Sequence, residues 1–88
     1  MTDRRIYIAI GARIRQMRLR AGMSQGQLAK AVEWHRPSVT NCEMGKQRLP
    51  IHQLFRIARA LGMEAIHLLP LDVDAPPKRP KRRQGARL

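Results

Sequence analysis

The chain has 88 residues, of which 18 are Lys or Arg and 6 are Asp or Glu, so its formal net charge is +12. This length allows one small domain with a single core. Such a domain is too small for a typical enzyme, which binds its substrate in a cleft that excludes water. The positive charge indicates a polyanionic partner, either a nucleic acid or an anionic membrane. The apolar runs IYIAI and AIHLLPL are far shorter than the ~20 residues of a membrane-spanning helix, so we expect no membrane partner.

Cysteine and histidine usage indicates the compartment and argues against a metal. Cys42 is the single cysteine, so the chain forms no internal disulfide, and a reducing cytoplasmic location fits best. The apolar part of MTDRRIYIAIG is too short for a secretory signal. His35, His52 and His67 do not have the spacing of metal ligands. We therefore expect neither a metal nor another cofactor.

Charge and proline content predict the domain boundaries. Residues 1–71 hold 12 Lys or Arg and 4 Asp or Glu, and residues 72–88 hold 6 and 2, with three prolines and no aromatic residue. Such a tail buries too little surface to offset its chain entropy. We predict an N-terminal arm at 1–7, a folded domain at 8–71 and a basic, disordered tail at 72–88.

The first helical pattern places one charged residue on its apolar face. At helical spacing this face contains Ile10, Ile14, Met17, Arg18 and Ala21, and Gly22 follows as a stop. A guanidinium in this position needs an acidic partner, because an unpaired buried charge is costly.

A second, short helix is predicted from Ser24 over about nine residues. Ser24 and Gln27 have the spacing of a capping box, in which each side chain satisfies a free backbone N–H. Leu28, Ala29 and Val32 form its inward face.

A third helix is predicted from about Pro37 to Gly45, since proline suits the first helical position. Val39, Cys42 and Glu43 face inward, and Glu43 is the one acidic residue on that side. By elimination we pair it with Arg18. The outward face consists of Arg36, Pro37, Thr40, Asn41 and Met44.

The remaining apolar pattern predicts a fourth helix that begins at Pro50 and stops at Gly62, followed by a last turn from Glu64 to Leu69. The fold class is all-α with five helices. The inward residues of the fourth helix are Ile51, Leu54, Phe55, Ile57, Ala58 and Leu61.

The second and third helices form a helix-turn-helix, whose second helix can enter the major groove of DNA. Arg36 can form a bidentate pair with guanine, Asn41 with adenine, and Pro37 can contact a thymine methyl. Thr40 and Ser38 can each reach a base or a phosphate, and we assign Thr40 to bases and Ser38 to phosphates. Base contact is therefore predicted for Arg36, Pro37, Thr40 and Asn41.

Three further residues are predicted to bind phosphates. Gln25 begins the second helix, where free backbone N–H groups and the positive dipole end favour an anion. Lys46 and Arg48 follow the third helix and neutralise phosphates rather than read sequence.

The segments IGARIRQMRLRAGMSQGQLAKAV, HRPSVTNCEMGKQRLP and LFRIARALGM resemble the Cro and lambda-repressor type helix-turn-helix family, also called the xenobiotic response element family. The resemblance spans about residues 8–69 and implies a five-helix DNA-binding domain that acts as a dimer on near-palindromic operators. It also implies the Arg18–Glu43 ion pair, a phosphate-clamping role for Gln25 and base reading by the third helix.

Two positions depart from the family pattern. Glu33 stands where the family usually has Gly, at a turn position that tends to need positive φ. His35 stands where the family has a helix-capping Ser or Thr, and histidine is a poorer cap.

The sequence thus predicts a sequence-specific regulator of transcription that binds double-stranded DNA, acting as a dimeric repressor whose subunits meet through Ile66, Leu68 and Leu69. An antitoxin or other adaptor whose tail binds a second protein is the alternative, and a controller of a restriction–modification system is a related interpretation. The scarcity of aromatic residues argues against RNA binding. The chain has no paired carboxylates, Ser/His/Asp arrangement or phosphate-cradling Gly-rich loop, so catalysis is not expected.

Overall fold

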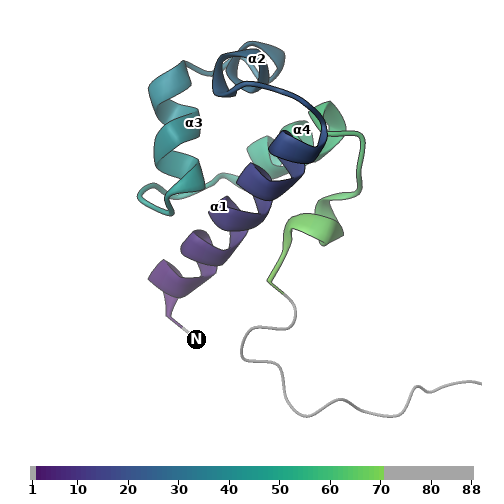
Figure 1. The fold of residues 1–88 in the computed structure, drawn as a ribbon. Helices are drawn as coiled ribbons and strands as arrows, with labels where there is room; N and C mark the ends of the chain where they lie inside the picture. Colours follow the sequence, from purple (N-terminus) through teal and green to yellow (C-terminus); the bar gives the residue numbers. More distant parts are fainter. Residues whose placement is uncertain (1, 71–88) are drawn as a thin grey trace, which may run out of the picture.

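A computed structural model describes residues 2–70 of the chain (Figure 1). The predicted tail at 72–88 lies outside the described residues. Within them, four α-helices and one 3₁₀ helix follow one another without a strand, which confirms the all-α class. None of the described helices is both long enough and apolar enough to cross a bilayer.

Helix α1, Asp3–Arg20, is longer than predicted. It begins where Thr2 accepts a hydrogen bond from Arg5 N at 3.2 Å, and Asp3 in the first turn complements the helix dipole. The expected arm at residues 1–7 is therefore wrong, because its residues from Asp3 onward are helical. Ala21 is exposed because it follows the end of the helix.

Helix α2, Gln25–Ala31, lies beyond the C-terminal end of α1, and helix α3, Arg36–Glu43, lies beside α1 (Figure 1). The predicted capping box of α2 is present: Ser24 N donates to Gln27 Oε1 at 2.7 Å and Gln27 N to Ser24 Oγ at 3.0 Å. Helix α3 packs tightly on α1 at Gly11, where a Cβ would lie 2.7 Å from the Glu43 carbonyl oxygen. A side chain at this position would push α3 away from the core.

Helix α4, Ile51–Ala60, and the 3₁₀ helix η1, Ala65–Leu68, close the bundle. The core contains Ile14, Leu28, Val39, Ile57 and Leu68, each at most 1% exposed.

Two residues predicted to face inward from α4 do not. Ile51 is 72% exposed and Phe55 58% exposed. Helical spacing makes Gln53, Leu54, Ile57 and Ala58 the buried stripe instead, so Ile51 and Phe55 fall on its flank. Gln53 enters the core because its Nε2 donates to Val32 O at 3.1 Å, satisfying a carbonyl at the end of α2.

Candidate nucleic-acid interface

The turn between α2 and α3 contains the only non-glycine residue with positive φ in the described part of the chain. Glu33 has φ 61°, as its place in the family pattern implied. The backbone then reverses, and Trp34 N donates to Ala29 O at 2.8 Å while the half-buried indole packs against the core. This turn sets the angle at which α3 leaves α2.

The outward face of α3 presents three of the four predicted base-reading residues to solvent. Arg36, Pro37, Asn41 and Met44 are exposed, whereas Ser38 and Thr40 are half-buried. Pro37 lies in the first turn, where its missing N–H leaves no hydrogen bond unmade. The side chains that can contact base edges therefore share one accessible face.

The N-cap of α3 is His35, which has an extended backbone and no side-chain hydrogen bond to the helix. Because Ser38 N bonds to the His35 carbonyl at 3.0 Å, the turn is closed by backbone alone. The capping function implied by the family pattern is thus unfilled at this position.

A buried ion pair holds α3 against α1 from behind. Arg18 Nε lies 2.6 Å from Glu43 Oε2, and Arg18 Nη2 lies 3.1 Å from Glu43 Oε1. Arg18 Nη1 also donates to Met23 O at 2.8 Å. The structure thus brings together the two residues that the sequence analysis paired. A bidentate ion pair of this kind fixes the orientation of α3 relative to α1 as well as the distance between them.

Gln25 and Thr40 extend this pair toward the surface, a connection that sequence reasoning missed. Gln25 Nε2 donates to Glu43 Oε1 at 3.1 Å, and Thr40 Oγ1 donates to Gln25 Oε1 at 2.9 Å. Thr40 Oγ1 also lies 3.2 Å from Arg36 O. The single hydroxyl proton of Thr40 is therefore used inside the protein. No spacing in the sequence predicts this connection, because it depends on how α2 packs against α3.

Cys42 faces the core beside this network. Burial, and to a lesser degree the negative charge of Glu43, raise the pKa of its thiol to about 11. The thiol is neutral at physiological pH and packs as a small apolar side chain.

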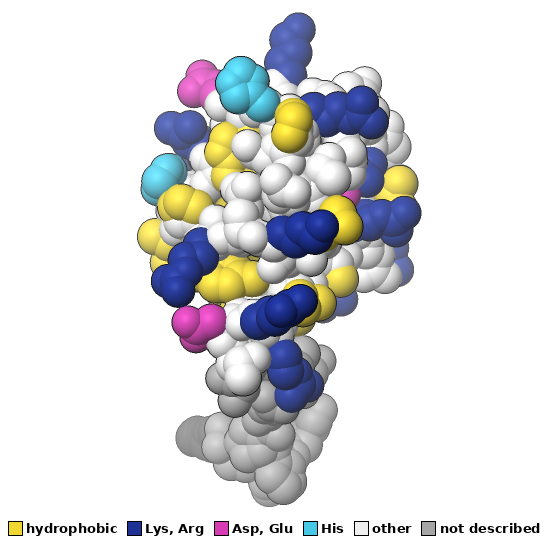
Figure 2. All heavy atoms as spheres, turned by 90° about the vertical axis from the view of Figure 1, so that its left-hand side faces the viewer, with side chains coloured by type: hydrophobic (Ala, Val, Ile, Leu, Met, Phe, Trp, Pro, Cys, Tyr) yellow, Lys and Arg dark blue, Asp and Glu magenta, His cyan; other side chains and the backbone are white. Residues whose placement is uncertain are grey.

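Lys46 and Arg48 stand in the segment between α3 and α4, and both are exposed. Figure 2 views the molecule from the α3 side and shows Lys and Arg side chains spread over this face, with few acidic ones. The described residues carry 12 Lys or Arg against 4 Asp or Glu. Such a surface attracts polyanions and favours contact with phosphates.

Comparisons with known proteins agree with this geometry. A family model for the helix-turn-helix domain matches residues 9–69. The control protein C.BamHI of Bacillus amyloliquefaciens is 32% identical over 65 residues, which cover 73% of this chain and 80% of that protein.

Solved structures with a similar fold include a controller protein and a part of an enzyme. The restriction-modification controller protein C.AhdI from Aeromonas hydrophila has 28% identity and a TM-score of 0.69, covering 72% of this chain and 91% of that one. The hydroxypropylphosphonic acid epoxidase from S. wedmorenis has 26% identity and a TM-score of 0.71, covering 78% of this chain but 38% of the enzyme. The likeness to the epoxidase therefore concerns only a part of that enzyme.

Proposed function

The chain belongs to the helix-turn-helix domain family of DNA-binding transcriptional regulators, and from this premise we propose that it represses transcription as a dimer on a near-palindromic operator. The proposed role is binding and not catalysis, and its place of action is the DNA of the cytoplasm.

The exposed face of α3, held from behind by the buried Arg18–Glu43 pair, is the observation that carries this proposal. Arg36 and Asn41 read guanine and adenine in the major groove, and Pro37 contacts a thymine methyl. Thr40 contributes to this face, although its hydroxyl is bonded to Gln25 in the free protein.

Four residues are proposed to contact phosphates on either side of the groove: Gln25, Ser38, Lys46 and Arg48. For Gln25 this is compatible with its bond to Glu43, because an amide nitrogen carries two hydrogens and Glu43 accepts one. These contacts position the protein without selecting sequence.

The test is selection of bound sites from a random duplex library at physiological salt. We expect two related half-sites in inverted order, with centres about 10–10.5 bp apart or a multiple of this. Enrichment of a single unsymmetrical site contradicts the dimer, and no enrichment over random DNA contradicts sequence reading.

The subunit contact expected from the sequence needs correction. Leu68 is 0% exposed and belongs to the core of its own chain, so it is not available to a partner, and Leu69 is half-buried. Ile66 is 54% exposed, and Ile51 and Phe55 are exposed on the neighbouring helix α4. We therefore assign the subunit contact to an apolar patch of Ile51, Phe55 and Ile66.

This assignment predicts that charge in the apolar patch separates the subunits. Ile66→Glu is expected to lower the mass measured by sedimentation equilibrium from two chains to one. Leu19→Glu is the matched control, because Leu19 on α1 is 52% exposed and lies outside the patch. A wild-type mass of one chain at micromolar concentration, with or without DNA, contradicts the dimer.

The relatives favour one regulatory role over the others considered. C.BamHI is named a control protein and C.AhdI a restriction-modification controller, so we propose that this chain controls restriction–modification genes. The selected operator is then expected upstream of such genes. Deletion of residues 72–88 tests the antitoxin alternative: loss of a co-purifying protein with operator binding intact favours it.

A further inference from the structure

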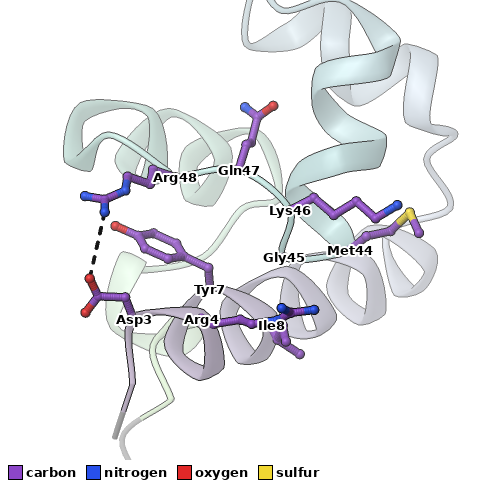
Figure 3. A pocket seen from close by; sticks show the side chains of 9 residues that line it. All are labelled: Asp3, Arg4, Tyr7, Ile8, Met44, Gly45, Lys46, Gln47 and Arg48. Atoms are coloured by element: carbon purple, nitrogen blue, oxygen red, sulfur yellow. Dashed lines mark ion pairs between the residues drawn. The ribbon is translucent and has the colours of Figure 1, made fainter.

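An open hollow of about 440 Å³ lies between the first turns of α1 and the segment that follows α3 (Figure 3). Asp3, Arg4 and Tyr7 line it from α1, and Lys46 and Arg48 line it from the other side. We propose that this hollow is a seat for one phosphate of the DNA backbone, with Arg4, Lys46 and Arg48 as its cations and Asp3 as an anion that competes for Arg48. This proposal rests on the proposed DNA-binding function and adds Asp3 and Arg4 of α1 to its interface with DNA.

The backbone of the hollow is held in place by close packing. Gly45 has φ +73°, and a Cβ there would lie 2.5 Å from Ile8 Cα. The chain leaving α3 is thus pressed directly onto α1. Arg4, one turn before Ile8, and Lys46, next to Gly45, are therefore kept on opposite walls of one hollow. The fold therefore fixes the backbone positions from which these side chains extend.

The charges of the hollow favour an anion. The lining includes three cationic side chains, those of Arg4, Lys46 and Arg48, and a single carboxylate, that of Asp3. In Figure 3 Arg48 extends toward Asp3, whereas Arg4 and Lys46 extend toward the other side of the hollow. Within the described part of the chain, Arg4 and Lys46 form no ion pair. A hollow with this net positive charge draws in a phosphate, whose oxygens accept the hydrogen bonds that the guanidinium groups offer.

Asp3 is placed to be displaced by that phosphate. Asp3 Oδ2 lies 3.9 Å from Arg48 Nη2, and both side chains are largely exposed. An exposed pair at this distance is weak, so a phosphate oxygen can replace the carboxylate. Tyr7 also lines the hollow, and in the view of Figure 3 its ring appears beside the Asp3–Arg48 pair.

The position of the hollow suits the edge of a groove. Met44, the residue after α3, lines it. When α3 lies in a major groove about 12 Å wide, the sugar-phosphate backbone passes beside the ends of the helix. The phosphate seat is at one of these ends, so recognition by α3 brings a phosphate to it.

The first test combines Arg4→Ala with duplexes in which single phosphates are replaced by uncharged methylphosphonates. Wild-type protein is expected to lose up to about tenfold in affinity at one phosphate per half-site, the value of one neutralised contact near 0.1 M salt. Arg4→Ala is expected to lose affinity for the unmodified duplex and to be insensitive to that one replacement. Its salt slope is expected to fall by ~0.9 per half-site, and so by ~1.8 for the bound dimer, on selected and random duplexes alike.

Arg56→Ala is the matched control, because Arg56 lines a different hollow with Val32 and Ala60. If Arg4→Ala binds as wild type does, or if its loss adds to the methylphosphonate loss at every phosphate, the phosphate seat is refuted. Wild-type binding to DNA without any sequence preference contradicts the proposed function instead. The phosphate seat is then still tested by the affinity and salt slope of Arg4→Ala on random duplexes.

The second test is Asp3→Asn, with Glu64→Gln as a control that removes the same charge elsewhere, in a hollow lined by Phe55 and His67. Loss of one negative charge ~7 Å from a phosphate raises affinity about threefold in water. We expect this gain once per subunit for Asp3→Asn, about sevenfold for the bound dimer, on selected and random duplexes equally, and a smaller one for Glu64→Gln. Equal gains for the two variants, or none for Asp3→Asn, contradict competition by Asp3.

Discussion

Gln25 Nε2 lies 3.1 Å from Glu43 Oε1, so the residue at the start of α2 is bonded to the carboxylate that also holds Arg18. Gln25 is the residue proposed to meet a phosphate, and Glu43 ends the helix proposed to read bases. The buried carboxylate of Glu43 therefore connects the residue proposed to contact a DNA phosphate with the helix whose orientation decides base reading.

Removing the charge of Glu43 is expected to unfold much of the domain. In Glu43→Gln, Arg18 stays 6% exposed without its anion, and breaking such a buried pair costs about 3–5 kcal/mol of folding free energy. Urea unfolding followed by circular dichroism measures the loss. The double variant Arg18→Met with Glu43→Leu removes both charges and is expected to recover most of it. A Glu43→Gln midpoint equal to that of wild type contradicts the role assigned to the pair.

Glu33→Gly is expected to stabilise the protein. Glu33 has φ 61°, a conformation that is costly for any residue with a Cβ, so we expect a gain of about 0.5–1 kcal/mol after allowing for the greater chain entropy of glycine. The variant also loses an exposed pair to Arg56 at 3.7 Å, which is worth little. Thermal unfolding measures the gain, and Arg56→Ala isolates the ion-pair part. A lower melting temperature for Glu33→Gly than for Arg56→Ala contradicts this prediction.

His35→Ser is expected to supply the missing cap of α3. His35 has cap geometry without a side-chain bond to the helix, and a serine hydroxyl can accept a backbone N–H of the first turn, worth about 1 kcal/mol. Urea unfolding measures the gain, with His35→Ala as the control that cannot cap. Equal midpoints for the two variants show that the cap does not form.

The helices and the helix-turn-helix were predictable from the sequence because local signals agree there. The Ser24–Gln27 box, the glycine stops and the placing of Arg18 and Glu43 on inward faces all depend on residues close along the chain. Ile51 and Phe55 were assigned to the wrong face because an apolar side chain at a helix flank has the same sequence signature as one in the core. Buried Gln53 shows the converse, since its hydrogen bond to Val32 O joins elements 21 residues apart.

In the candidate site, the residues on one helix face were predictable from the sequence, whereas the contacts between different elements were not. The outward residues of α3 followed from helical periodicity, and all of them are exposed except Thr40, which is half-buried. The Gln25–Thr40 bond and the Asp3–Arg48 pair join residues of different helices or loops. No spacing in the sequence encodes such contacts, because they depend on how the helices pack.

Cys42 predicts a component of alkaline stability. Because burial raises the pKa of its thiol to about 11 in the folded state, from an ordinary value of 9.0, the unfolded chain loses this proton first as pH rises. The contribution to stability is therefore complete below about pH 9 and is lost between about pH 9 and 11. Urea midpoints at pH 8 and 10.5 are expected to differ more for wild type than for Cys42→Ala. The same difference in both proteins contradicts this assignment.

Arg36→Ala and Arg48→Ala are expected to separate base reading from phosphate binding. Arg36 is exposed on α3 and Arg48 lies beyond it in the following segment. Loss of a bidentate guanine contact costs about 1–3 kcal/mol at one base position. Arg36→Ala is therefore expected to bind all four bases there with similar affinity, whereas Arg48→Ala weakens binding to every sequence to the same degree and lowers the salt slope. Affinities for the selected site, its single-base variants and random DNA, measured at two or more salt concentrations, distinguish the two outcomes. An equal loss for Arg36→Ala on selected and random duplexes would show that Arg36 contacts the backbone and reads no base.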